Sequence, residues 1–210
     1  MKKAKKIIAL TALICAAGIL LCSCGKGNKF SFNKNGLVDK KTDVTYIDAP
    51  DCYSPIAVSE EVYGHLDDYR FYEIIGISPS RFVAEADGTV FYASNISLPD
   101  IDELQVSYMD ICTETTTLKV NKTVEAGEDI KAIIGGYLSE ENIYYPNLTP
   151  ETMYEIRFAD TSLGLYYTLT FIRYASDYGE QGRDFLYNRS ANRFVKAPDV
   201  LVRYIDELSA

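Results

Sequence analysis

The only histidine of this 210-residue chain, His65, is the side chain whose pKa best suits acid–base catalysis near neutral pH. It occurs in the sequence YGHLDDYR, where Asp67 and Asp68 could orient its imidazole as a general base. Residues two and three positions apart are neighbours in any loop, however, and the chain contains no GxSxG or HExxH motif. We therefore expect His65 to be a surface or capping residue and the chain to have no catalytic residues.

Carboxylates form several short clusters, which could bind a cation or supply the acid–base pair of a glycosidase. The clusters are Glu60 with Glu61, Asp67 with Asp68, Asp100 with Asp102 and Glu103, Glu128 with Asp129, and Glu140 with Glu141. None has the spacing of an EF-hand loop, and 30 acidic residues in 210 produce such clusters by chance. We expect a solvated acidic surface and no metal site. The chain also lacks GxxxxGK[ST] and GxGxxG motifs, so we expect no nucleotide cofactor.

Tyrosine is the side chain most suggestive of binding, with 17 tyrosines in the chain and no tryptophan. The sequences IYYPN and GLYYTL concentrate it, at Tyr144, Tyr145 and Tyr166. Tyrosine offers a rigid contact that is apolar on its faces and polar at its tip, as binding surfaces require. These three residues are our candidate binding surface. The alternative is that tyrosines fill one buried face of a sheet.

The amino terminus has the features of an export signal. Lys2, Lys3, Lys5 and Lys6 precede an apolar run from residue 7 to residue 21, which is shorter than a typical membrane-spanning helix. The run ends in Leu21, Cys22, Ser23 and Cys24. These four residues resemble the lipobox of bacterial lipoprotein precursors, in which leucine precedes two small residues and a cysteine.

The resemblance implies that residues 1–23 are a signal peptide and that Cys24, the first residue after cleavage, carries acyl chains such as palmitate. Two or more acyl chains hold a protein stably on a bilayer. The expected location is therefore the extracytoplasmic face of the cell membrane, with membrane lipid as a partner through Cys24. An ordinary signal peptide cut near Ser23, and an uncut anchor, are the alternatives.

After the signal peptide, residues 24–36 are rich in Gly, Asn, Lys and Ser, which predicts a flexible tether. Its lysines, Lys26, Lys29 and Lys34, could contact anionic headgroups or only keep the tether soluble. Residues 24–210 carry 17 basic and 30 acidic side chains, a formal charge of −13. Such a charge repels nucleic acid, so we expect no nucleic-acid partner.

Two cysteines, Cys52 and Cys112, remain in the folded part once the signal peptide and Cys24 are set aside. In an exported protein they could form a disulfide that closes a loop of about 60 residues and contributes roughly 3–4 kcal/mol. The alternative is two buried thiols, because cysteine packs as a small apolar residue.

The patterning predicts one domain, residues 37–210, of the α+β class, built mainly of antiparallel hairpins. Hairpins are expected at residues 81–94, around Asp87–Gly88, and at residues 153–174 and 184–196. Strands are also expected at residues 42–48, 70–77, 104–111 and 115–120. Apolar residues at helical spacing predict amphipathic helices at residues 127–138 and 197–208, and a short helical turn at residues 59–66.

These expectations favour a non-enzymatic lipoprotein that binds another envelope protein or a small ligand at the cell surface. A cell-envelope hydrolase is the first alternative, and it would need His65 beside a nucleophile or a metal. A small solute-binding lipoprotein of a transporter is the second alternative.

Overall fold

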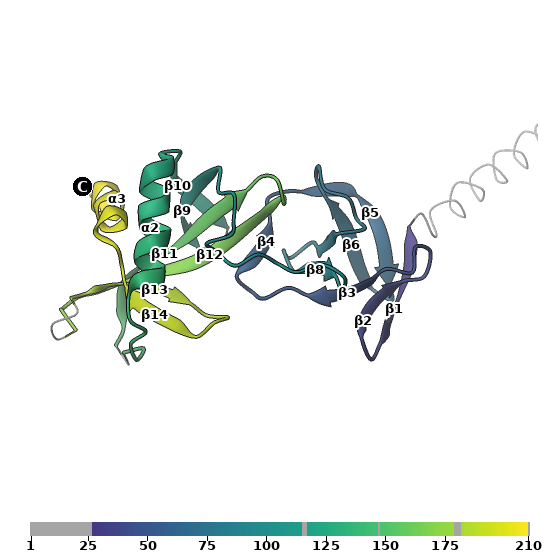
Figure 1. Ribbon diagram of the computed structural model, residues 1–210, viewed down its shortest axis with the longest axis horizontal. Coiled ribbons are helices and arrows are strands. Elements are labelled where there is room, and N and C mark those ends of the chain that lie inside the picture. The colour runs from purple at the N-terminus through teal and green to yellow at the C-terminus, as the bar shows by residue number, and fades with distance from the viewer. Residues whose placement is uncertain (1–26, 115–116, 147, 179–181, 210) are drawn as a thin grey trace, which may run out of the picture.

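The computed structural model describes residues 27–114, 117–146, 148–178 and 182–209. In these residues the chain forms fourteen β-strands and two α-helices (Figure 1). The fold is mainly β, with a closed seven-stranded barrel and a second sheet. The predicted α+β class is therefore wrong, because half of the strands close on one another instead of forming a sheet that helices cover. No helix in the described ranges is long and apolar enough to span a membrane.

The barrel occupies the first part of the described chain. Its strands are β1 (Asn28–Asn33), β2 (Gly36–Asp39), β3 (Thr45–Asp48), β5 (Val58–Leu66), β6 (Tyr69–Ile74), β7 (Phe82–Glu85) and β8 (Val90–Ala93). They run around the barrel in the order β1-β2-β3-β8-β7-β6-β5. Neighbouring strands are antiparallel, except that β1 pairs with β5 in parallel through Asn28 and Lys29. This parallel pair closes the barrel.

Six buried side chains fill the barrel: Phe30, Leu37, Tyr46, Phe71, Val83 and Phe91. The rings of Phe30 and Phe71 lie 4.8 Å apart between centroids. Gly64 makes this packing possible, because a β-carbon there would lie 1.9 Å from the Phe30 ring. Any larger residue at position 64 would displace Phe30 from the centre of the barrel.

Two local predictions fail in the barrel. Residues 28–33 of the expected tether form β1, because the alternation of Asn28 and Phe30 with exposed neighbours buries one face of the segment. The folded part therefore begins before residue 37. Residues 59–66, expected as a helical turn, belong to β5, where pairing with β6 outweighs local propensity. The hairpin at Asp87–Gly88 is confirmed, and Gly88 has the positive φ (98°) that the turn requires.

The second sheet contains the remaining strands. They are β4 (Tyr53–Pro55), β9 (Tyr108–Glu114), β10 (Leu118–Val124), β11 (Pro150–Asp160), β12 (Leu165–Tyr174), β13 (Asp184–Asn188) and β14 (Arg193–Lys196). The order is β10-β9-β11-β12-β13-β14, and β4 pairs with the start of β12. The predicted hairpins β11–β12 and β13–β14 are confirmed, and β9 pairs with β10.

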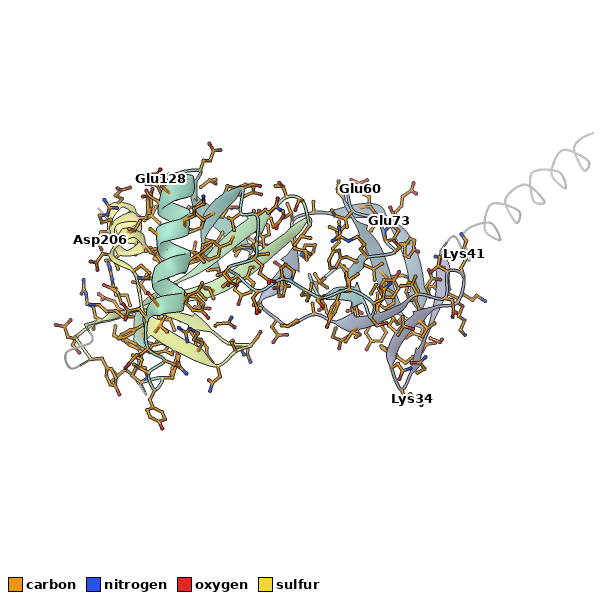
Figure 2. All side chains as sticks on the ribbon, viewed as in Figure 1. Lys34, Lys41, Glu60, Glu73, Glu128 and Asp206 are labelled. Carbon is orange, nitrogen blue, oxygen red and sulfur yellow. The ribbon has the colours of Figure 1, made fainter. Side chains whose placement is uncertain are left out.

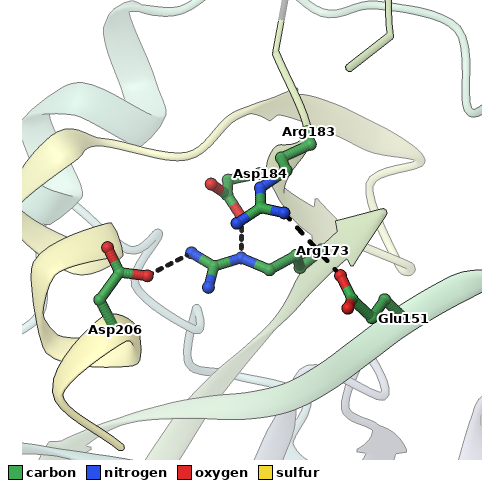
Figure 3. Close-up of polar contacts among 5 residues, drawn as sticks. All are labelled: Glu151, Arg173, Arg183, Asp184 and Asp206. Atoms are coloured by element: carbon green, nitrogen blue, oxygen red, sulfur yellow. Dashed lines mark hydrogen bonds and ion pairs between the residues drawn. The ribbon is translucent and has the colours of Figure 1, made fainter. Parts of the chain in front are cut away.

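Both predicted helices are confirmed, as α2 (Gly127–Ser139) and α3 (Asp199–Ser209). Their apolar residues, such as Ile133 and Leu201, join the core on one face of the second sheet. Arg173 of β12 links α3 to the sheet: its Nε donates to Asp184 at 2.5 Å, and its Nη2 lies 2.8 Å from Asp206 of α3 (Figure 3). The Arg173 side chain is 8% exposed and that of Asp184 is 18% exposed, so this charge-assisted bond is largely shielded from solvent, whereas the Asp206 side chain is 58% exposed.

The barrel and the second sheet share a continuous core. Ile74 and Phe82 of the barrel belong to the same apolar cluster as Leu165 of β12 and Ile133 of α2. Together with the β4–β12 pairing, this cluster joins the two parts side by side along the long axis of the molecule (Figure 1). The barrel with β1 and β2 lies at one end, and β13, β14 and α3 lie at the other.

Candidate binding surface

Tyr144 and Tyr145 lie in the loop between α2 and β11. Tyr144 is 92% exposed, and Tyr145 is 46% exposed. A side chain as exposed as that of Tyr144 adds little to the stability of the fold. Such a side chain is available for contact with another molecule.

Two polar groups hold this loop in place. The Nη2 of Arg193 donates to the carbonyl oxygens of Tyr137 (3.0 Å), Leu138 (3.1 Å) and Glu140 (2.7 Å) at the carboxyl end of α2. These carbonyls have no helical partner, so the arginine completes the helix end. The side chain of Asn142 then accepts a hydrogen bond from the Phe194 N–H at 2.8 Å. The loop is thus fixed to β14 just before Tyr144.

The ring of Tyr145 packs against the sheet. Its centroid lies 5.2 Å from Tyr187 and 4.9 Å from Phe194. Phe194 in turn belongs to an aromatic cluster with Ile172, Tyr174 and Phe185, on the face of the sheet opposite the helices. Burial, and to a smaller extent the nearby Tyr145 hydroxyl, raise the pKa of Tyr174, although its hydroxyl makes no hydrogen bond of ordinary length and angle among the described residues. One side of Tyr145 is therefore anchored while the other faces outward.

A hollow of about 480 Å³ lies beside these rings. It is lined by Asn142, Ile143, Tyr144, Tyr145, Asn192 and Phe194. This is the size of a small-molecule site, and such sites combine aromatic walls with a few polar groups. None of the lining side chains carries a charge at neutral pH. The hollow suits an uncharged ligand or an uncharged segment of a partner.

Sequence reasoning found the two tyrosines of this hollow but missed Asn192 and Phe194. These residues come from the β13–β14 hairpin, about 50 positions further along the chain. Asn192 has a positive φ of 46°, a turn conformation that asparagine tolerates, and nothing in its neighbours pointed to a binding role. Hydrogen bonds between the loop and β14, together with the packing of Tyr145 on Phe194, bring the two segments together.

Tyr166, the third candidate, does not belong to this surface. It is 8% exposed, and its hydroxyl donates to the carboxylate of Asp110 at 3.2 Å and lies 3.0 Å from the Tyr108 hydroxyl. The guanidinium of Arg157 stacks on its ring at 3.8 Å. Tyr166 therefore has almost no surface to offer a partner, because Arg157 covers its ring and strand β4 lies beside it in the sheet.

Asp110 forms the centre of a satisfied polar network. It is 5% exposed and accepts hydrogen bonds from Tyr166 and from Thr123 Oγ1, the latter at 2.6 Å. A buried carboxylate with such partners can stabilise a fold without any catalytic task. The same holds for Asp160, which accepts bonds from the backbone of Gln105, Ser162 and Leu163.

His65 lies on β5, opposite Arg70 of β6 and beside Lys29 of β1. The residues opposite His65 on the two neighbouring strands are thus basic. Neither is a nucleophile that His65 could activate nor an acid that could orient its imidazole. In the part of the chain that the structure describes, no group of three or more His, Cys, Asp or Glu side chains is placed to hold a metal ion.

Cys52 and Cys112 are both free and buried, so of the two alternatives the structure has the buried thiols and not the possible disulfide. The two thiols lie on opposite faces of the second sheet. Cys52 precedes β4 and neighbours Tyr167 on the helix-covered face, whereas Cys112 on β9 neighbours Arg157 and Asp110 on the other face. Burial raises the pKa of both thiols. Cys24, the expected acylation site, lies outside the described residues.

Comparison of the chain with protein-family models, with curated proteins and with solved structures finds no match, so its function has to be argued from the chain itself.

Proposed function

We propose that this protein is an exported lipoprotein, held on the extracytoplasmic face of the cell membrane by an acylated Cys24, and that its folded part is a non-enzymatic binding module. The lipobox-like sequence from Leu21 to Cys24 is the basis for the anchor. The hollow beside Tyr144 and Tyr145 is the basis for the binding role.

The observation that carries the binding role is the combination of exposure and fixation at Tyr144. The side chain is 92% exposed, yet Arg193 and Asn142 fix the part of the loop that leads into it. A rigid exposed aromatic loses little conformational entropy on binding, which is why such residues dominate recognition surfaces. The loop also lies beside β14, at the end of the molecule opposite β1 (Figure 1). A partner at this end would be approached away from the proposed anchor.

The chemistry of the hollow defines what it would bind. Ile143 and the aromatic rings provide apolar contact, and the Asn142 and Asn192 amides can exchange hydrogen bonds. We infer an uncharged segment of another envelope protein, or a small neutral ligand, as the occupant. The small ligand would make this chain a solute-binding lipoprotein, which is the second candidate function.

Labelled palmitate tests the anchor. Wild-type protein produced in a bacterial host should incorporate the label, and Cys24→Ser should not. Incorporation by the Cys24→Ser variant would mean that another residue is acylated and that the proposed attachment is wrong.

A photo-cross-linking amino acid at position 144 tests the binding role in cells. We expect one discrete cross-linked product, which Tyr145→Ala should abolish because it removes the neighbouring ring. The same cross-linker at Leu118, which is 40% exposed on β10, serves as the matched control and should give no such product. For a small ligand, a panel of neutral sugars and amino acids should raise the melting temperature of the wild type but not of Tyr145→Ala. No product and no thermal shift together would overturn the binding role.

A further inference from the structure

The basic side chains of this acidic protein are concentrated at its first strands. Residues 27–44 carry four lysines and two aspartates, whereas residues 45–210 carry 12 basic and 28 acidic side chains. The four lysines, Lys29, Lys34, Lys40 and Lys41, are all exposed. The ion pairs of the described residues involve Lys122, Arg173 and Arg183, and none of these four lysines. Their charges are therefore available to another molecule.

The backbone holds three of the lysines around one hollow. Lys40 N–H donates to the Lys29 carbonyl at 2.9 Å, which places the turn after β2 beside the start of β1. The resulting hollow of about 520 Å³ is lined by Gly27, Asn28, Lys29, Lys40 and Lys41. Lys34 stands at the tip of the β1–β2 hairpin, on the same end of the molecule as Lys41 (Figure 2).

The aspartate inside this region is not available to neutralise the lysine side chains. Asp39 is fully buried, and its carboxylate accepts hydrogen bonds from Asn28 Nδ2 (2.7 Å), Thr42 Oγ1 (2.8 Å), the Lys41 N–H (2.8 Å) and the Tyr63 hydroxyl (3.0 Å). These bonds also fix the turn that presents Lys40 and Lys41. Asp43, which is exposed in the same turn, is the one acidic side chain of residues 27–44 that reaches solvent.

An exposed aromatic residue accompanies the lysines. Phe32 of β1 is 63% exposed, on a hairpin whose tip carries Lys34. Lysines and an exposed aromatic ring at the same end of a protein are the combination with which proteins bind the interface of an anionic bilayer, since the ring enters the headgroup region and the ammonium groups bind the phosphates.

We propose that this end of the barrel, defined by Lys29, Lys34, Lys40, Lys41 and Phe32 and here called the basic surface, docks on the headgroups of an anionic phospholipid membrane. The inference rests on the proposed function, because the acylated Cys24 lies only three residues before Gly27. Three residues span at most about 11 Å, which is close to the distance over which salt screens charge. The rest of the molecule is acidic and is repelled by the anionic membrane. The charges therefore favour an orientation in which the basic surface faces the lipid headgroups.

The absence of tryptophan from the chain permits a direct test. Phe32→Trp and, as the matched control, Tyr144→Trp each place a single tryptophan at one end of the full acylated protein. The two variants are reconstituted on vesicles of phosphatidylcholine alone or with phosphatidylglycerol, in each case with brominated acyl chains that quench nearby tryptophan. We expect quenching of Trp fluorescence for Phe32→Trp on the anionic vesicles and none for Tyr144→Trp.

Lysine variants test the cause of the docking. Removing one lysine charge near an anionic membrane weakens association about fivefold. We therefore expect a triple variant to dock about 100-fold more weakly and to show no quenching; it combines Lys29→Gln, Lys40→Gln and Lys41→Gln. The control combines Lys119→Gln, Lys131→Gln and Lys196→Gln, which are exposed and distant in sequence, and should leave the quenching unchanged.

The outcomes separate this proposal from the anchor. Protein that floats with neutral vesicles, but shows no quenching of Phe32→Trp on anionic ones, is anchored without docking and overturns the proposal. Equal quenching of both tryptophan variants overturns it too, because the molecule would then have no preferred face. If Phe32→Trp is quenched on anionic vesicles but the protein does not float with neutral ones, the result supports docking through the basic surface and argues against an acyl anchor at Cys24. Failure to associate with either vesicle overturns both.

Discussion

The guanidinium carbon of Arg157 lies 3.8 Å from the centre of the Tyr166 ring. The two residues come from neighbouring strands, β11 and β12, and Arg157 Nη2 also donates to Ser54 Oγ of β4 at 3.1 Å. The stack therefore links the second sheet to the strand that enters it from the barrel. It explains why a tyrosine that the sequence places on a polar face is almost inaccessible to solvent.

Removing this stack should loosen the junction between β4 and β12. We expect Arg157→Ala to lower the free energy of unfolding by about 1–3 kcal/mol, measured by urea denaturation, since it loses both the cation–π contact and a hydrogen bond. Arg157→Lys is the control: it keeps the charge but not the planar group, so it should recover only part of the loss. A change of less than about 0.5 kcal/mol for Arg157→Ala would contradict the structural role.

The thiol groups of Cys52 and Cys112 should be present in the folded protein and slow to react. Burial raises the pKa of both, so little thiolate is available to attack a disulfide reagent. We expect slow modification by a chromogenic disulfide in buffer, and rapid modification of both residues in denaturant. Mass spectrometry of unreduced protein should give the mass of the dithiol. A mass lower by two hydrogens would contradict the buried, separate positions.

Two buried tyrosines should respond oppositely to loss of their hydroxyl groups. The Tyr46 hydroxyl donates to the Pro79 carbonyl at 2.7 Å, whereas the Tyr174 hydroxyl has no partner among the described residues. We expect Tyr46→Phe to lower the free energy of unfolding by about 1 kcal/mol or more, and Tyr174→Phe to leave it unchanged or raise it by up to about 1 kcal/mol. Equal destabilisation of both variants in thermal and urea melts would show that Tyr174 has a partner in solution.

The stability of the barrel should depend on the charge of Asp39. Burial acts to raise the pKa of this carboxyl, but hydrogen bonds from the Lys41 backbone, Thr42, Asn28 and Tyr63 together lower it below its ordinary value. Because the folded-state pKa is depressed, the stabilisation is complete above the unfolded-state pKa and is lost as pH falls through the folded-state value.

We therefore expect Asp39→Asn to destabilise the protein at neutral pH by about 1.5–3 kcal/mol, the range for hydrogen bonds to a charged group. The difference between wild type and variant should begin to shrink as pH falls below about 4, the ordinary value of the carboxyl, and should be lost below the lower pKa of the folded state. Urea denaturation of both proteins across this range is the measurement. A difference that is constant with pH would mean that the carboxylate charge plays no part.

Local patterns predicted most of the second sheet and both helices, because the information lies within each segment. The turn at Asp87–Gly88 needs a residue with positive φ, and the glycine shows this in the sequence. Apolar and polar residues alternate in β11 and β12 because one face of these strands is buried. The barrel was not predictable in this way. Its closure depends on Asn28 and Lys29 pairing with residues about 36 positions away, and on Phe30 packing over Gly64.

The candidate site was predictable only in part. The composition drew attention to Tyr144 and Tyr145, but the same signal at Tyr166 misled, since alternation identifies the two faces of a strand and not what covers each one. Arg157 and β4 cover Tyr166, whereas nothing in the described residues covers Tyr144 to a similar degree. Asn192 and Phe194 reach the hollow through tertiary structure alone.

All seven barrel strands lie between residues 28 and 93, without interruption by any part of the second sheet except β4. If the chain is exported amino end first, as proposed above, its barrel can close while the later residues are still on the inner side of the membrane. Strand β4 would have no strand to pair with until β12 has crossed the membrane. Until then Tyr53 would lack its contact with Tyr167 and would be exposed. Stalled chains ending near residue 105 should then resist proteolysis over the barrel but remain open to cleavage around residues 50–56.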